Sequence, residues 1–186
     1  MDEYAVANNA AFFSKVLDST RPLKSVLELG CNVGQNLQAL KLLLPECRLA
    51  AVEINQFAAA QVKTNMPEVE LWNHSIFEFN TNETFDLVFT KGVLIHVNPE
   101  QLSDAYQILH QKSNRYILVS EYYSRNPEEL PYRGHEGKLF KRDFAGELLI
   151  QHQDLRLVDY GFIYHRDPNF PQDDMNWFLM EKQSST

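Results

Sequence analysis

With 186 residues, of which 44% are apolar and 23% charged, the chain is large enough for one globular domain with a full hydrophobic core. Its 17 Lys and Arg residues are outnumbered by 25 Asp and Glu residues, and the net charge of −8 argues against nucleic acid as a partner. No apolar run could span a bilayer, no signal-peptide pattern is present, and the two cysteines show no disulfide or metal-binding spacing. These features predict a soluble, cytoplasmic protein that binds no membrane and holds no metal.

The first elements of the chain follow a helix–strand–turn–helix order. Residues 1–17 carry apolar side chains at helical spacing and are followed by a breaker segment that ends at Pro22. We expect this helix to lie over a ligand cleft or over the face of a sheet. The stretch Ser25–Asn36 changes from a short apolar run to a glycine-containing turn and then to helical spacing. Such a turn brings backbone N–H groups and a helix N-terminus close to a ligand.

The spacing in this turn is Glu28-x-Gly30-x-x-x-Gly34, which differs from the dinucleotide fingerprint because Asn32 stands where a middle glycine would be. Asn tolerates the left-handed conformation, so the turn can still form. The second predicted strand ends in Glu53, where a carboxylate can accept both hydroxyls of a ribose. Together these residues resemble the class I methyltransferases that depend on S-adenosylmethionine (SAM). The alternative is a βαβ unit that binds no nucleotide.

The segment after the second strand predicts a further helix and strand. We expect the helix over 56–65, closed by Pro67, and the strand over 69–72. In the enzymes that this half of the chain resembles, the loop after the third strand holds the adenine, and Ser75 and Ile76 occupy those positions here. A plain solvent loop is the alternative.

The run Phe85–Thr90 is almost continuously apolar, as expected of a central parallel strand that is buried on both faces. A helix from about 99 to 111 and a fifth strand over 116–120 follow. Open α/β sheets bind ligands beyond the carboxyl ends of their strands. The residues expected near the reacting methyl group are therefore Thr90, Lys91, Gly92 and His96.

The alternation of elements breaks at residues 124–146, where a long loop is expected. Between positions 132 and 142 this loop carries four basic residues and one acid, a local charge of +3: Arg133, Lys138, Lys141 and Arg142 against Glu136. Such a basic island predicts a pocket for a small anion, with Arg133 and His135 as functional residues. For Lys141 and Arg142 the alternative is the solvated start of a helix over 143–151.

The chain ends in two strand patterns, 155–160 and 176–181, which predict an antiparallel edge of the sheet. The expected fold is α/β: a Rossmann-like, seven-stranded, mostly parallel sheet with helices on both faces, as in class I methyltransferases. Residues 1–186 are expected to form a single methyltransferase domain with a substrate-loop insertion at about 122–142.

A closer resemblance runs over nearly the whole chain. It rests on these segments: Glu28–Asn36, Lys91–Pro99, Glu121–Tyr123, Tyr132–His135, Leu139–Glu147, Asp159–Phe162 and Phe170–Asp174. They are similar to the methylases found with pseudaminic acid biosynthesis genes. The resemblance implies a SAM-dependent methyltransferase that acts on a nonulosonic sugar acid, an activated form of it, or a related small anion, and that releases S-adenosyl-L-homocysteine.

These observations give the expected site residues. Methyl transfer from a sulfonium needs alignment and exclusion of water, and a base near pKa 7 suits a hydroxyl or ammonium acceptor. The candidate bases are His96 and then His135, with Tyr123 orienting the acceptor; the alternative for His96 is a core or capping role. The expected cofactor-binding residues are Glu28, Gly30, Cys31, Asn32, Gly34, Asn36, Glu53, Ile54, Ser75, Ile76, Thr90, Lys91 and Gly92. The expected substrate-binding residues are Tyr122, Tyr132, Arg133 and Lys138.

Three other functions fit the same pattern. A methyltransferase fold can bind SAM as a sensor or scaffold without turnover, and an active enzyme can act on another small carboxylate or phosphate metabolite or on a peptide. The sequence leaves open whether oxygen, nitrogen or a carboxylate is methylated, and which oligomer forms.

Overall fold

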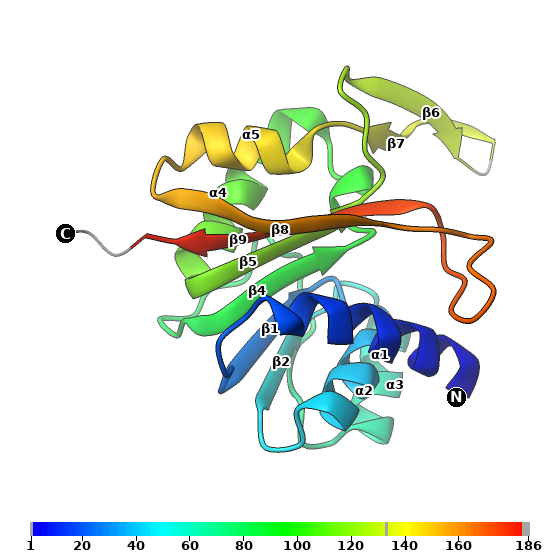
Figure 1. The fold of residues 1–186 in the computed structure, drawn as a ribbon, viewed down its shortest axis with the longest axis vertical. Coiled ribbons are helices and arrows are strands. Elements are labelled where there is room, and N and C mark those ends of the chain that lie inside the picture. The colour runs from blue at the N-terminus through cyan, green and yellow to red at the C-terminus, as the bar shows by residue number, and fades with distance from the viewer. Residues whose placement is uncertain (1, 133, 184–186) are drawn as a thin grey trace.

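The computed structural model describes residues 2–132 and 134–183, and for Tyr132, His135, Glu136 and Lys138 it describes the backbone alone. Seven strands form one sheet in the order β3-β2-β1-β4-β5-β9-β8 (Figure 1). The first five strands pair in parallel, whereas β9 runs antiparallel to both β5 and β8. The strands are β1 (Ser25–Leu29), β2 (Arg48–Val52), β3 (Glu70–Trp72), β4 (Phe85–Lys91), β5 (Ser113–Glu121), β8 (Leu155–Ile163) and β9 (Met175–Lys182).

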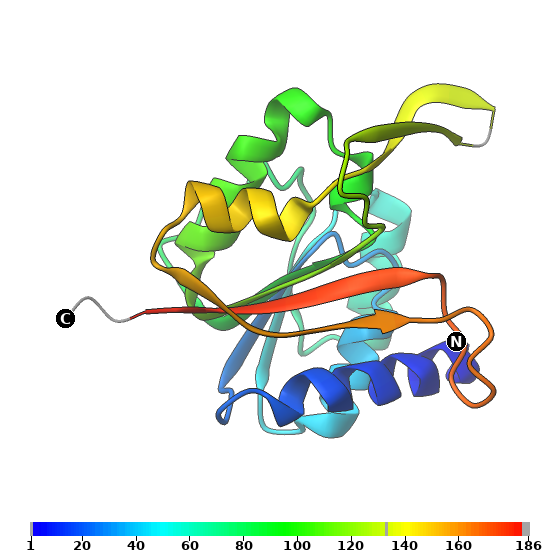
Figure 2. The same ribbon diagram turned by 45° about the horizontal axis from the view of Figure 1, so that its top comes forward.

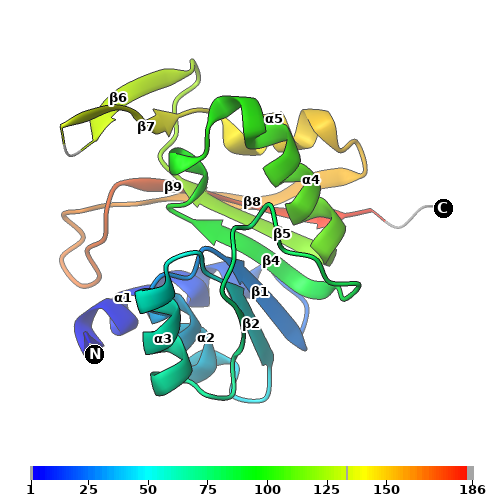
Figure 3. The same ribbon diagram turned by 180° about the vertical axis from the view of Figure 1, so that it is seen from behind.

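Helices cover both faces of this sheet (Figures 1 and 3). One face packs against α1 (Glu3–Asp18), α2 (Gln35–Leu43) and Val62 of α3 (Gln56–Asn65). The other face packs against α4 (Leu102–Lys112) and α5 (Phe144–Gln151). The expected seven-stranded α/β architecture with helices on both faces is confirmed. No helix in the described part of the chain is long and apolar enough to cross a membrane.

The two faces follow from the alternation of side chains along each strand. In β4, Leu87 and Phe89 join the core beneath α1, while Val88 between them joins the core beneath α4. The same alternation places Glu28 and Lys91 on the α1 side of the sheet and Glu121 on the α4 side. Charged side chains at the carboxyl ends of β1, β4 and β5 therefore lie on both faces of the sheet.

The N-terminal helix lies on the sheet face, which is one of its two expected places. Phe12, Phe13 and Val16 are buried, and the ring of Phe13 meets that of Phe89 edge-on at 5.3 Å between centroids. The helix begins at an N-cap, Asp2, whose side chain accepts from the backbone of the first turn.

Residues 124–142 differ from the expected loop. They contain an antiparallel hairpin of β6 (Glu128–Tyr132) and β7 (His135–Lys141), which projects from the body of the molecule (Figures 1 and 2). The hairpin is anchored at its base, where Leu139 is buried and β7 packs against the 3₁₀ helix η1 (Leu94–His96). The expected helix over 99–111 also divides, into a 3₁₀ turn η2 (Pro99–Gln101) and α4.

Candidate functional site

The turn between β1 and α2 has the left-handed geometry that its glycines permit. Gly30, Asn32 and Gly34 have φ values of 83°, 49° and 83°. The N–H of Gly30 donates to the carbonyl of Val52 at 2.8 Å, which ties the turn to the end of β2. A Cβ atom on Gly30 would lie 2.7 Å from a methyl group of Val93, so no larger residue fits without movement.

Glu53 holds this turn from the neighbouring strand. Its side chain is 7% exposed, and its two oxygens accept from the N–H groups of Asn32 at 2.6 Å and of Asn55 at 2.7 Å. A carboxylate has about four acceptor positions, so these two hydrogen bonds leave capacity for outside donors such as ribose hydroxyls. The ribose-binding role of Glu53 stays a prediction, and the structure adds a second role in fixing the loop.

Glu28 is fully buried beside the turn. The side-chain amide of Asn36 donates to Oε1 of Glu28 at 2.6 Å, whereas Oε2 has no hydrogen-bond partner. Burial raises the pKa of Glu28 to about 8, and the hydrogen bond from Asn36 and the charge of Lys91 oppose that rise. A buried oxygen without a partner is costly, so this position suits a donor or cation of a bound ligand.

Lys91, the last residue of β4, places a positive charge at the carboxyl ends of the parallel strands. Its ammonium lies 5.7 Å from the ring centroid of Phe12 in α1. Burial lowers the pKa of Lys91, and the carboxylates of Glu28, Asp173 and Glu121 oppose that shift. Acidic and basic groups therefore meet beyond the ends of the parallel strands, where sheets of this kind bind ligands.

Glu121 also lies at the carboxyl end of a strand, although the sequence alone assigned it no role. This buried carboxylate at the end of β5 accepts from the N–H groups of Val93 and Leu94 at 3.1 Å and of Ile95 at 3.4 Å. Burial raises the pKa of Glu121 to about 7, against the effect of these hydrogen bonds. The sequence does contain a feature that could have identified Glu121: it is an acidic residue at the end of an apolar strand, as Glu53 is.

A cavity of about 250 Å³ lies beyond the ends of β1, β2 and β3. The turn residue Gly30 lines it, together with four other residues that the sequence placed in the site: Ile54, Ser75, Ile76 and His96. Its wall is mostly apolar, as expected of a pocket for an aromatic ring. The remaining lining residues carry no sequence pattern that singles them out: Val52, His74, Phe77, Val93, Val97, Asn98 and Gln101.

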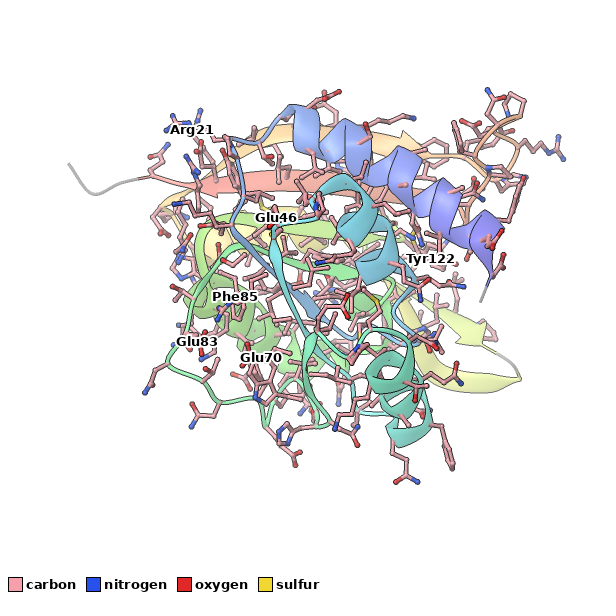
Figure 4. The ribbon with its side chains drawn as sticks, turned by 90° about the horizontal axis from the view of Figure 1, so that it is seen from below. Arg21, Glu46, Glu70, Glu83, Phe85 and Tyr122 are labelled. Atoms are coloured by element: carbon pink, nitrogen blue, oxygen red, sulfur yellow. The ribbon has the colours of Figure 1, made fainter. Side chains whose placement is uncertain are left out.

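Tyr122 occupies a second part of the site. Its hydroxyl donates to Asp173 at 3.3 Å, and the ammonium of Lys141 lies 5.7 Å from the centroid of its ring. Figure 4 shows Tyr122 at the end of the sheet that carries the hairpin and the start of α1, far from Arg21 and Phe85. Asp173 was not assigned a role from the sequence.

Four other expected residues, Tyr123, Thr90, Cys31 and Gly92, do not line this cavity. The ring centroids of Tyr123 and Phe178 lie 6.0 Å apart. Thr90 and Cys31 are buried. Gly92 lies beside Met175, with a positive φ of 70°. Arg133 lies outside the described residues, as do the side chains of Tyr132, His135 and Lys138.

One basic residue of the hairpin region has a structural partner. Arg142 donates through Nε to Glu147 of α5 at 2.8 Å, and the hydroxyl of Tyr106 donates to the other oxygen of Glu147. Arg142 thus lies just before α5 and forms an ion pair with it, and its place in an anion pocket stays a prediction. Lys141, by contrast, faces the aromatic ring of Tyr122.

The raised pKa of Glu28 predicts a pH dependence of stability. The unfolded chain takes up this proton near pH 4.5 and the folded chain near pH 8. Between these values the folded state binds more protons, so the free energy of unfolding falls as the pH rises. Urea unfolding at pH 5.5 and 7.5 should show a fall that is smaller in Glu28→Gln than in the parent, by about 1 kcal/mol per pH unit.

The exposed carboxyl of Glu46, labelled in Figure 4, provides the control. Glu46→Gln should keep the pH dependence of the parent. The same slope in the parent and in Glu28→Gln would show that the buried carboxyl is already ionised at pH 5.5.

Comparisons with known proteins agree with this geometry. Residues 26–112 match the family model of a methyltransferase domain. Among solved structures, a SAM-dependent methyltransferase from Clostridium acetobutylicum aligns with a TM-score of 0.70 at 12% identity, over 96% of this chain and 92% of its own. The N-methyltransferase NodS from Bradyrhizobium japonicum, in complex with S-adenosyl-L-homocysteine, aligns with a TM-score of 0.72 at 16% identity, over 96% and 87%.

A further solved structure is that of 1,6-didemethyltoxoflavin-N1-methyltransferase from Burkholderia thailandensis, with a TM-score of 0.71 and 18% identity over 98% of this chain and 80% of its own. A search of curated protein sequences gave no match. The shared fold confirms the expected α/β architecture of the class I methyltransferases.

Proposed function

We propose that this chain, a methyltransferase with the class I fold, transfers the methyl group of SAM to a small anionic acceptor, a nonulosonic acid of the pseudaminic type or its activated form. The observation that carries the proposal is the cavity beyond β1, β2 and β3, lined by Gly30 and the loop after β3. Its apolar wall suits an adenine ring, and Glu53 stands at the neighbouring strand end where ribose hydroxyls need an acceptor.

The residues present fit the cofactor in two further respects. The unpartnered Oε2 of Glu28 offers an acceptor for an ammonium group, and a Cβ at Gly30 would close the space beside Val93. Bound SAM supplies an electrophilic methyl group on a sulfonium. We therefore assign the adenosine to the cavity, with Ser75 and Ile76 beside the base, and the amino-acid end to Glu28.

The chain's own residues then need to orient the acceptor and accept its proton. Tyr122 and Asp173 provide hydrogen-bonding groups for sugar hydroxyls, and Lys91 and Lys141 provide positive charge for a carboxylate or phosphate. His96 lines the cavity and carries an imidazole, which makes it the proposed general base. Arg133 and Lys138 of the hairpin remain proposed residues for binding the methyl acceptor, and His135 remains the second candidate base.

The direct test combines binding with turnover. Calorimetric titration with SAM should show one site per chain, and incubation with labelled SAM and a panel of free and nucleotide-activated sugar acids should give a methylated product by mass spectrometry. No SAM binding would overturn the proposal as a whole. Binding without any product across the panel would favour a SAM sensor or scaffold, or an enzyme for another acceptor.

Lys141→Gln tests the anionic nature of the acceptor. Because one partly exposed ion pair contributes up to about 1 kcal/mol, the KM for the acceptor should rise about five-fold, while the Kd for SAM stays unchanged. Lys63→Gln, at an exposed position on α3, is the matched control and should change neither constant. A weakened Kd for SAM in Lys141→Gln would place this lysine in the cofactor site instead.

A further inference from the structure

Two histidines and one aspartate meet at the opposite end of the sheet from the cavity. His110 lies in the last turn of α4, His152 follows α5, and Asp154 precedes β8. The Nε2 atom of His110 lies 2.9 Å from each oxygen of Asp154, and one ligand atom from each of the three residues falls within 4.8 Å of the others. His110 and Asp154 are 44 positions apart, which is why no metal-binding spacing appears in the sequence.

His152 offers a free nitrogen to this group. The residue is 9% exposed, and its Nε2 atom is buried without a hydrogen-bond partner. The backbone of Tyr106 holds the other side of the ring through a hydrogen bond. A backbone carbonyl bonded to one ring nitrogen is the usual support of a metal-binding histidine, because it fixes the tautomer and leaves the lone pair on the other nitrogen.

The surroundings also favour a cation. The carboxyl ends of both α4 and α5 point to this place, and the partial negative charge of a helix C-terminus attracts positive charge. Lys182 lies nearby, but its ammonium donates to the carbonyl oxygens of His110 and Ser113, each at 2.6 Å. The side chains of His110 and Asp154 are 20% and 46% exposed, so water can complete a coordination shell.

We propose that His110, His152 and Asp154 bind one divalent transition-metal ion of the Zn²⁺, Co²⁺ or Ni²⁺ type. Two imidazole nitrogens and one carboxylate are a ligand set that suits these ions. The two rings are stacked, with centroids 4.0 Å apart and planes 3° apart, so the partly exposed ring of His110 must turn for both nitrogens to reach one ion. The ion would join the ends of α4 and α5 to the start of β8, and its role would be structural.

The test uses the tag-free protein, stripped of metal, and Zn²⁺ or Co²⁺ alone. Calorimetry at pH 7.5 should show one ion per chain, and the Tm should rise with metal concentration. His110→Gln and Asp154→Asn should each weaken binding by about 10- to 100-fold or more, since even supporting residues of metal ligands have effects of that size. Both positions are partly exposed, and the Tm without metal confirms that each variant is folded.

His165→Gln is the matched control. His165 and Asp174 form an exposed pair at 2.8 Å, yet in the described part of the chain they belong to no three-residue ligand group. This variant should bind metal like the parent. Equal binding by all variants, a thiolate–Co²⁺ absorption band from Cys31 or Cys47, or no binding at about 1 mM metal would each overturn the proposal, and none of these results bears on methyl transfer.

Discussion

Gly30→Ala should abolish measurable SAM binding, with a loss of at least about 100-fold in Kd. The added Cβ would lie 2.7 Å from the side chain of Val93, and its backbone has a φ of +83°, which costs an L-residue about 1–2 kcal/mol. Val93 lines the proposed adenosine cavity, so relief of the clash must move the wall or the turn. Calorimetric titration with SAM measures the loss.

Gly134→Ala is a matched control, because Gly134 has a φ of +81° and nothing within 4 Å of an added Cβ. It carries the same backbone strain without the clash, and its Kd for SAM should equal that of the parent. The double variant Gly30→Ala with Val93→Ala should recover part of the binding. An unchanged Kd in Gly30→Ala alone would remove this turn from the cofactor site.

Glu53→Gln should weaken SAM binding by about 10- to 100-fold, which corresponds to a loss of about 1.5–3 kcal/mol from charge-assisted hydrogen bonds. The amide keeps the shape of the carboxylate but has one acceptor oxygen, whereas Glu53 accepts from the N–H groups of both Asn32 and Asn55 and would also meet the ribose. Calorimetry again provides the Kd.

The Tm separates the two roles of Glu53. If the carboxylate serves the ribose, the Kd changes much more than the Tm; if it only holds the loop, the Tm falls and SAM still binds at low temperature. Glu78→Gln, at an exposed position after β3, is the control and should leave both quantities unchanged. Unchanged SAM binding by Glu53→Gln would refute the ribose assignment.

The sheet could be predicted from the sequence because its strands are local apolar runs separated by helical patterns. The cavity residues were also accessible, since parallel strands bring their carboxyl ends to one edge and the loops after β1, β2 and β3 must meet there. Gly30, Ile54 and Ser75 lie within four residues of such an end. Position along the chain was therefore sufficient to group them.

The hairpin β6–β7 could not be predicted in this way. Its strands contain Glu128, Glu129, Pro131 and Gly137, residue types that are depleted in strands, so the local pattern indicated a loop. The pairing depends on contact between two segments and on the burial of Leu139. The low strand propensity of these residues was therefore outweighed by the tertiary packing of the hairpin.

Polar contacts between residues far apart in the chain could not be predicted from the sequence either. Asp173 meets Tyr122 from 51 positions away, and Glu121 reaches back to Val93 from 28 positions away. Neither contact follows a helix or strand period. They form because the antiparallel strand β9 and the segment after β4 fold against β5, and these neighbours are defined only by the complete sheet.

The 3₁₀ helix η1 contacts both the proposed SAM cavity and the hairpin proposed to bind the methyl acceptor. His96 of η1 and the preceding Val93 form part of the cavity wall, and β7 of the hairpin packs against η1. An acceptor that binds to the hairpin would therefore act through η1 on the donor pocket. By thermodynamic reciprocity, each ligand would then tighten the binding of the other by the same factor, and donor and acceptor would enter as a cooperative pair.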